Sequence, residues 1–392
     1  MNKMIIFCAD GTWNGPGQDD DEDSVPEYTN VYKLFLTLAG AMSIDSIKKA
    51  NEQEKELITR NDNRLLQVVK YIHGVGDSHN IIHKILGGAF GAGIISRIVR
   101  GYTFISRNYE PNDNIVIVGF SRGAYTARAL AGLIASQGLL AKHLVQNNTE
   151  EEKKEAYKCG ARAWYLYRKD SKKSGAFLAN LVQAMDDLPA FLSRDRLCKE
   201  DFIPIEHIKA VGVWDTVGAL GIPRYVDNEK LDVYRFTDTK LSPIVENGFH
   251  AVSLDDRRQD FTPTLWDKSE RITQILFPGA HADVGGGYTT KNNESGLSDI
   301  ALMWMIDQLK SIGAHFDNQE SWQFLYKPDI RGTAHKPWLY PPFNLKNIRI
   351  QARNFSNTAI KEHPSISERM ALDKVLHDPC EKPSPYKPLN RP

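Results

Sequence analysis

The stretch IVIVGFSRGAYTARALAG, residues 115–132, decides the fold of this chain. Four consecutive β-branched apolar residues lead into Gly-Phe-Ser-Arg-Gly at 119–123, and small residues with helical spacing follow at once. An uninterrupted β-branched run is typical of a strand that is buried on both faces of a parallel sheet. The stretch therefore predicts a buried parallel strand, a tight turn and a helix. It leaves open whether Ser121 is a nucleophile on that turn or an idle residue at a corner built from small side chains.

The alternation of strand and helix extends along much of the chain. Further strand-like runs end in small or polar residues at 4–12, 208–216 and 272–281. Helical spacing is found at 29–40, 96–109 and 124–138. Because alternating strands and helices form layered folds with few permitted topologies, we predict an α/β fold with a mainly parallel sheet flanked by helices.

Two regions interrupt this alternation. Residues of about 140–205 are charged and mostly helical, which indicates a helical insertion. Residues 321–392 are rich in Pro and aromatic side chains and predict an irregular C-terminal layer. We therefore expect a catalytic domain over 1–320 that carries the insertion, with the layer belonging to the same domain.

The composition excludes several classes of protein. Lys plus Arg equals Asp plus Glu, so the formal net charge is zero and a nucleic-acid partner is not expected. The cysteines at 8, 159, 198 and 380 lack metal-ligand spacing and predict buried free thiols. The first apolar run has six residues, which is too short for a signal peptide, and no run approaches the ~18 residues of a membrane span. We expect a protein that is made in the cytoplasm.

The sequence around Ser121 is a complete G-x-S-x-G pattern with a strand before it and a helix after it. A serine on such a strained turn needs glycine on both sides, here Gly119 and Gly123, because a side chain would collide with the neighbouring strand or helix. The helix that follows directs its N-terminal N–H groups at the same place. We therefore predict Ser121 as the nucleophile, with the N–H of Arg122 as one oxyanion donor.

A nucleophilic serine needs a histidine base and a carboxylate that orients it. In α/β-hydrolases these follow in the order Ser, acid, His, each just past a strand. Asp215 follows the run at 208–216, and His281 lies in a Gly-rich loop after the run at 272–281. The order makes Asp215 and His281 our candidates and the fold α/β-hydrolase-like.

Other residues compete for these roles. His250 is the best rival base, but we expect it to begin a helix and to act in packing or capping. Asp283 is too close in sequence to His281 to reach its ring, and Asp255 and Asp256 are expected in a charged helix, solvated or paired with the arginines that follow. Ser121, Asp215 and His281 therefore remain the preferred set.

The second oxyanion donor is expected in the loop after the first strand, where the backbone of Gly11 or Thr12 is the candidate. Asp10, just before it, is expected to organise this loop rather than to act chemically. An Asp10/Asp283 pair could bind a divalent cation, but nothing in the spacing requires one. We predict neither a metal nor a cofactor.

Several motifs together resemble one known family. They include DGTWN, GFSRGAYTARALAGL, VWDTVG, LDDRRQDF and FPGAHADVGGGY, and the resemblance runs from residue 4 to about 305 in order and again near 363–370. The family is the α/β-hydrolase-domain family that includes the type VI secretion phospholipase effectors. The resemblance implies a Ser-Asp-His triad at Ser121, Asp215 and His281 and cleavage of glycerophospholipid acyl esters of the A1 or A2 type. It also implies export by a type VI secretion system, contact with the secretion machinery and a matching immunity protein.

A lipid substrate would need an apolar cover over the site. The segment 175–192 has helix-spaced apolar residues and could be a lid or a peripheral membrane contact, or it could simply pack on the domain. The residues proposed to face the lipid are Phe177, Leu181, Val182 and Met185. Two functions remain as alternatives, an esterase on small or carbohydrate-linked acyl groups and a non-catalytic hydrolase-like binding module.

Overall fold

A computed structural model describes residues 2–11, 27–49, 51–74, 90–170, 197–217, 239–322, 324–341, 343–344, 350–356 and 358–392. Within them a sheet of nine strands has the order β11-β10-β9-β8-β5-β1-β4-β3-β2. The strands are β1 (Met4–Ala9), β2 (Ala41–Met42), β3 (Glu52–Ile58), β4 (Leu65–Ile72), β5 (Asn114–Phe120), β8 (Ile208–Trp214), β9 (Val245–Ser253), β10 (Ile272–Phe277) and β11 (Lys361–Glu362). All neighbours pair in parallel except β2 with β3 and β3 with β4.

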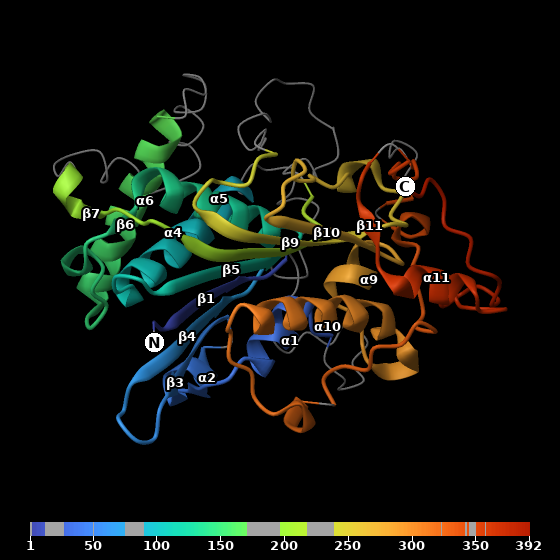
Figure 1. Ribbon diagram of the computed structural model, residues 1–392, viewed down its shortest axis with the longest axis horizontal. Coiled ribbons are helices and arrows are strands. Elements are labelled where there is room, and N and C mark those ends of the chain that lie inside the picture. The colour runs from blue at the N-terminus through green and yellow to red at the C-terminus, as the bar shows by residue number, and fades with distance from the viewer. Residues whose placement is uncertain are drawn as a thin grey trace.

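Helices cover both faces of this sheet (Figure 1). One face carries α4 (Phe90–Asn108), α5 (Arg122–Gln137) and α6 (Glu150–Asp170), and the other carries α1 (Asn30–Thr37) and α10 (Gly296–Ser311). The other α-helices of the described residues are short: α2 (Ile44–Lys48), α9 (His281–Gly285) and α11 (Pro364–Met370). A separate two-stranded sheet pairs β6 (Leu139–Leu140) with β7 (Phe202–Ile203) in antiparallel fashion. The α/β class with a mainly parallel sheet is therefore confirmed.

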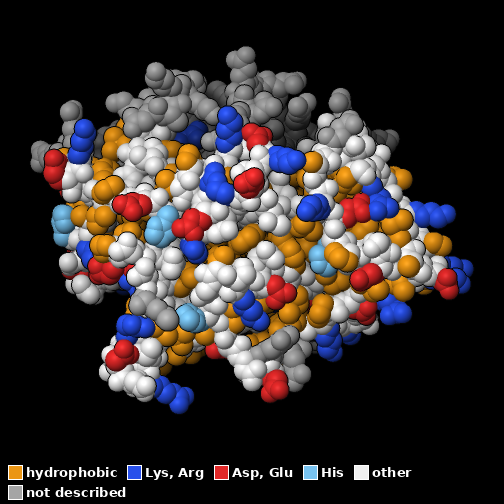
Figure 2. Space-filling model, in the orientation of Figure 1, with side chains coloured by type: hydrophobic (Ala, Val, Ile, Leu, Met, Phe, Trp, Pro, Cys, Tyr) orange, Lys and Arg blue, Asp and Glu red, His pale blue; other side chains and the backbone are white. Residues whose placement is uncertain are grey.

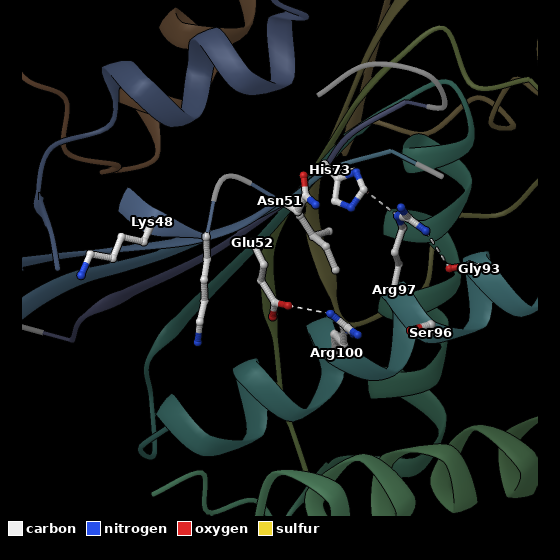
Figure 3. Close-up of a pocket in the computed structure, with 10 residues that line it drawn as sticks. Lys48, Asn51, Glu52, His73, Gly93, Ser96, Arg97 and Arg100 are labelled. Carbon is white, nitrogen blue, oxygen red and sulfur yellow. Dashed lines mark hydrogen bonds and ion pairs between the residues drawn. The ribbon is translucent and has the colours of Figure 1, made fainter. Parts of the chain in front are cut away.

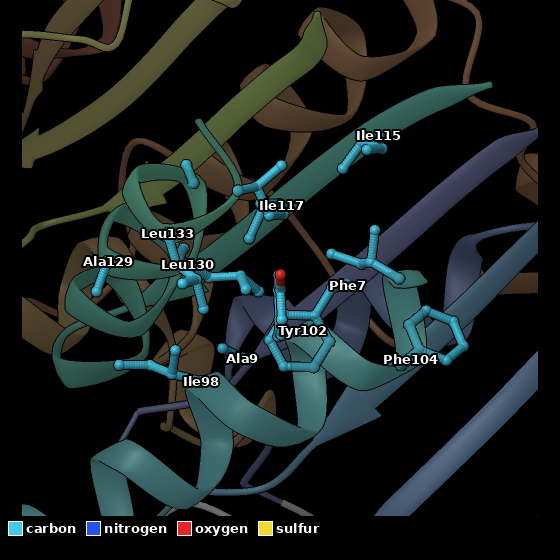
Figure 4. Packing of buried hydrophobic residues seen from close by; sticks show 14 of the residues in the cluster. Phe7, Ala9, Ile98, Tyr102, Phe104, Ile115, Ile117, Ala129, Leu130 and Leu133 are labelled. Carbon is cyan, nitrogen blue, oxygen red and sulfur yellow. The ribbon is translucent and has the colours of Figure 1, made fainter. Parts of the chain in front are cut away.

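The continuous apolar runs are explained by burial on both sides. In β1, Phe7 and Ala9 pack under α4 and α5 (Figure 4). Ile6 and Cys8 pack toward α1 and α10 on the other face. Since neither face of the central strands meets solvent, both faces carry mainly apolar side chains. This is why the runs lack the alternation of a half-exposed strand.

The sequence missed five strands of the sheet, of which β2 and β11 have only two residues each. Neither β3 nor β4 was predicted, and β9 was expected as a helix beginning at His250. That expectation is wrong, because His250 is fully buried inside β9. Its Nε2 accepts a hydrogen bond from the Thr216 N–H at 3.2 Å, and its Nδ1 lies 3.2 Å from Gln274 Oε1. Because both ring nitrogens have partners on neighbouring segments, a polar side chain can be buried in this strand.

The peripheral regions agree with the sequence in part. Helix α6 lies in the expected insertion, and β11 adds an edge strand from the C-terminal residues; the domain division itself stays a prediction. The four cysteines are free, but only Cys8 and Cys159 are buried, so the prediction is wrong for Cys198 and Cys380, which are exposed. On the face seen in Figure 2, basic and acidic side chains are interspersed, consistent with the zero net charge.

Candidate active site

Ser121 occupies the turn between β5 and α5 in a strained conformation. Its φ is 56° and its ψ is −118°, outside the regions that L-residues normally adopt. The Ser121 side chain makes no capping hydrogen bond to α5, although it stands at the N-cap position. Its N–H donates to the Trp214 carbonyl at the end of β8, at 3.1 Å. The turn is thus fixed by the sheet rather than by the serine hydroxyl.

The two glycines that flank this turn cannot be replaced without moving backbone. A Cβ on Gly119 would lie 2.2 Å from the Gly123 carbonyl oxygen, and a Cβ on Gly123 would lie 2.1 Å from the Ala9 carbonyl oxygen. Contacts this short do not occur between real atoms. The steric need for glycine inferred from the pattern is therefore present at both positions.

Gly123→Ala is expected to lower the free energy of unfolding by about 3 kcal/mol or more, because the added methyl group meets the backbone of β1. Urea denaturation followed by circular dichroism measures this. Gly132→Ala is the control, since it lies on the same helix beside a small surface hollow and should be neutral or slightly stabilising. Equal effects of both substitutions would contradict the close packing of the turn.

Asp215 and His281 are brought together by the ends of β8 and β10. His281 Nδ1 lies 2.6 Å from Asp215 Oδ2, and both side chains are buried. Asp215 follows β8, and its N–H donates to the Ala251 carbonyl at 2.7 Å. His281 was expected in a loop but is the first residue of the short helix α9. A carboxylate at Nδ1 holds the proton there and leaves Nε2 as the basic nitrogen.

Burial and charge set the protonation of this pair. Burial is the largest influence on the pKa of His281 and lowers it below 6.5, while Asp215 opposes this shift. Burial alone would raise the pKa of the Asp215 carboxyl, but Arg353 and His281 hold that pKa well below its ordinary value. At neutral pH the arrangement is therefore a neutral imidazole beside an ionised carboxylate.

Arg353 is a buried partner of Asp215 that the sequence analysis missed. Its Nη1 and Nη2 bind Asp215 Oδ1 and Oδ2 at 2.7 and 2.9 Å, which makes a bidentate ion pair. Nη1 also donates to the Ser253 carbonyl at 2.7 Å, and the Ser253 N–H donates to Asp215 Oδ1 at 2.9 Å. Arg353 lies in the region predicted as an irregular layer, and no motif around it marks it in the sequence.

The acidic residues after β9 support the histidine segment. Asp255 and Asp256 were expected in a charged helix, but they lie in a loop and are poorly accessible or buried. Asp256 Oδ2 accepts the His281 N–H at 3.1 Å and pairs with Arg258 Nη2 at 2.7 Å, so the predicted arginine pairing is confirmed. Asp255 Oδ2 accepts the Gly279 N–H at 2.7 Å. The helix prediction is wrong because these carboxylates serve as acceptors for the loop that carries His281.

Asp10 organises the loop after β1, as predicted. It accepts hydrogen bonds from Tyr71 Oη at 2.7 Å, Thr29 Oγ1 at 2.8 Å and the Gly11 N–H at 2.7 Å. Burial raises the pKa of Asp10 to about 7. The Gly11 N–H is therefore engaged by its neighbour in this arrangement, while Thr12 lies outside the described residues. The second oxyanion donor therefore remains a prediction. The role of the Arg122 N–H, at the first residue of α5, as the other oxyanion donor also remains a prediction.

The structure bears in part on three further expectations, which concern a cation site, a lid and a membrane span. Asp10 and Asp283 belong to separate networks, since Asp283 Oδ1 binds His335 Nδ1 at 2.6 Å. Across the described ranges, no group of three or more His, Cys, Asp or Glu side chains could hold a metal ion.

The lid residues Phe177, Leu181, Val182 and Met185 lie outside the described residues. Among the helices of the described part, none has the length and apolar character to cross a membrane.

Comparison with known families decides the classification. Residues 3–308 match the family model described as T6SS, phospholipase effector Tle1-like, catalytic domain. The chain belongs to this family. Membership makes the Tle1-like domain a hydrolase, and the match includes Ser121, Asp215 and His281 but ends before Arg353.

More distant likenesses are found among individual proteins. The uncharacterized protein YEL023C of Saccharomyces cerevisiae is 30% identical over 292 residues, which cover 70% of this chain and 34% of that protein. An uncharacterized protein from Pseudomonas aeruginosa has a TM-score of 0.42 at 20% identity, over 84% of this chain and 49% of its own. A Tle1 effector bound to the VgrG spike has a TM-score of 0.38 at 18% identity, over 74% and 52%. The Tle1-like chain thus spans about a third of the yeast relative and about half of these two solved chains.

Proposed function

We propose that the chain is a serine hydrolase that cleaves acyl esters of glycerophospholipids, a phospholipase of the A type. The observation that carries this proposal is the 2.6 Å contact between His281 Nδ1 and Asp215 Oδ2 at the same sheet edge as the strained Ser121 turn. The Tle1-like family supports the phospholipid substrate. No cofactor is required by this chemistry.

The proposed reaction has two steps. Ser121 Oγ attacks the ester carbonyl carbon and its proton passes to His281 Nε2, while Asp215 stabilises the imidazolium that forms. The tetrahedral intermediate collapses, the C–O bond to glycerol breaks, and His281 returns the proton to the leaving alcohol. Water then attacks the acyl-serine with His281 as base, which releases the fatty acid and restores Ser121.

A fluorophosphonate probe tests this proposal without knowledge of the substrate. We expect covalent labelling of wild type at Ser121, located by mass spectrometry of the labelled peptide, and none in Ser121→Ala or His281→Ala. Well-folded protein that takes up no label would argue for the non-catalytic binding module. Labelled protein that prefers soluble or carbohydrate-linked esters to vesicles would favour the esterase.

The pH dependence follows from the pKa of His281. The base must be neutral, and burial lowers its pKa below 6.5, opposed by Asp215 and Asp256 and assisted by Arg258. We therefore expect the acid limb of kcat/KM on a soluble ester to have its midpoint below pH 6.5. An acid limb with its midpoint above 6.5 would contradict the assignment of His281 in this environment.

The family also supports a role in bacterial competition, which we include in the proposal. The chain would then reach its target through a type VI secretion system, contact the secretion machinery and be neutralised in the producer by an immunity protein. Expression directed to the periplasm of a Gram-negative host is expected to arrest growth, and Ser121→Ala to abolish the arrest. Equal growth with both proteins would contradict the toxin role while leaving the chemistry untouched.

A further inference from the structure

A basic groove lies at the carboxyl end of β4, separate from the residues assigned above. It has a volume of about 520 Å³ and is formed by the end of α2, the start of β3, the end of β4 and one face of α4. Among the described residues that line it, the charged ones are Lys48, Lys49, Arg97 and Arg100 together with Glu52. All of these except Lys49 are labelled in Figure 3. The groove therefore has an excess of positive charge in a chain whose net charge is zero.

Most of this positive charge is not neutralised. Glu52 Oε2 binds Arg100 Nη1 at 2.7 Å, and Glu52 also pairs with Lys70. By contrast, among the residues that the structure describes, Lys48, Lys49 and Arg97 have no carboxylate within ion-pair distance. Asp10 and Glu52 attract Arg97 at longer range, but the basic groups of the groove still outnumber these carboxylates, so the groove attracts an anion from solution.

Arg97 is the fixed element of the groove. It is only 9% exposed, and its guanidinium is held by the His73 carbonyl through Nε at 2.7 Å and by the Gly93 carbonyl through Nη1 at 3.0 Å. These carbonyls orient the group without cancelling its charge and leave Nη2 without a hydrogen-bond partner in the described structure. A pre-oriented guanidinium is suited to phosphate oxygens. Ser96 and Asn51 place a hydroxyl and an amide in the same groove (Figure 3).

The groove opens at the same edge of the sheet as Ser121. Strand β4 pairs with β1, and β1 pairs with β5, which ends at the Ser121 turn. Adjacent strands are about 4.8 Å apart, so the ends of β4 and β5 are separated by roughly 10 Å. In a glycerophospholipid only the short glycerol unit separates the ester carbonyl from the phosphate. A phosphate at the groove could therefore belong to a lipid whose ester reaches the turn.

We propose that this groove binds a phosphate group and that its occupant is the head-group phosphate of the lipid substrate. The first part stands on the groove alone, and the second rests on the proposed phospholipase function. Arg97 is the central ligand, and Lys49 adds charge at the exposed rim. The groove thereby selects phosphate-bearing esters over neutral ones.

Binding is tested on the Ser121→Ala chain, so that the result does not depend on turnover. Isothermal titration calorimetry with sn-glycerol 3-phosphate is expected to show binding, and glycerol is expected to show none. Arg97→Gln should weaken the affinity at least about tenfold, as expected for loss of a charged hydrogen-bond donor. Lys49→Gln should weaken it by a smaller factor, and Lys268→Gln, also an exposed lysine but away from the groove, should have no effect.

The outcomes separate this proposal from the proposed function. Absence of glycerol 3-phosphate binding would overturn the proposed phosphate site, even if the enzyme is active. Equal affinities of Lys49→Gln and Lys268→Gln would also overturn it, and this comparison holds even if Arg97→Gln fails to fold. Binding of inorganic phosphate and glycerol 3-phosphate without Arg97-dependent binding to phosphatidylglycerol vesicles would overturn the head-group assignment. Groove-dependent binding in a wild-type chain that hydrolyses no lipid would support the phosphate site and contradict the phospholipase.

Discussion

Ser121→Ala and His281→Ala are each expected to lower kcat/KM on an ester substrate by roughly 10⁴- to 10⁶-fold, because each removes a member of a unit that acts together. The double variant should be no slower than the single ones, since loss of either member already disables the other. Initial rates on a soluble chromogenic ester and on phospholipid vesicles measure the effect.

Matched controls separate loss of chemistry from loss of fold. Ser136→Ala replaces an exposed serine on α5, and His143→Ala replaces an exposed histidine just beyond it. Both should retain wild-type rates. A Ser121→Ala protein that keeps more than a tenth of the activity would place the nucleophile elsewhere.

Loss of Arg353 is expected to have the second largest effect. Arg353→Met leaves the buried Asp215 without its bidentate partner, and removing one member of a buried ion pair costs about 3–5 kcal/mol of unfolding free energy. Arg353→Lys keeps the charge but not the planar two-point contact, so it should restore part of the stability. Arg391→Gln breaks a more exposed ion pair with Glu362 in the same C-terminal region and should cost at most about 1 kcal/mol.

The pH profile distinguishes positioning from mere stabilisation. Without the Arg353 cation, the pKa of Asp215 rises and the neighbouring imidazole becomes easier to protonate. The acid limb of kcat/KM should therefore move to higher pH in Arg353→Met, and move back in Arg353→Lys. An unchanged acid limb in a folded Arg353→Met protein would show that the arginine acts on stability alone.

The parts of the fold that could be predicted are those with local signals. The run at 115–118, the glycines at 119 and 123 and the helix after them carry their structure in a few adjacent residues, and β5 and α5 lie where they were expected. Strand β9 could not be predicted in this way. Its Glu246, Asn247 and Gly248 are poor strand formers, and the strand exists because β8 and β10 pair with it on both sides.

The residues of the candidate site also fall into those with a local sequence signal and those without one. Asp215 and His281 each follow a recognisable strand, so their order along the chain was informative. Arg353 and Asp256 act through contacts with residues that are far away in the sequence, and no motif spacing predicts such contacts. Arg353 is 138 residues from Asp215, and Asp256 binds a backbone N–H 25 residues away. Finding them requires the folded arrangement, because an arginine or aspartate in an irregular segment has no sequence signature of its own.

The most direct test of the central claim is the analysis of products from a phospholipid with different acyl chains at its two positions. Purified wild type is incubated with vesicles of that lipid, and released fatty acid and lysophospholipid are identified by mass spectrometry. We expect one fatty acid and the complementary lysophospholipid in equal amounts from wild type, and neither from Ser121→Ala. Release of a phosphorylated or free head group instead, or equal release by Ser121→Ala, would contradict the account.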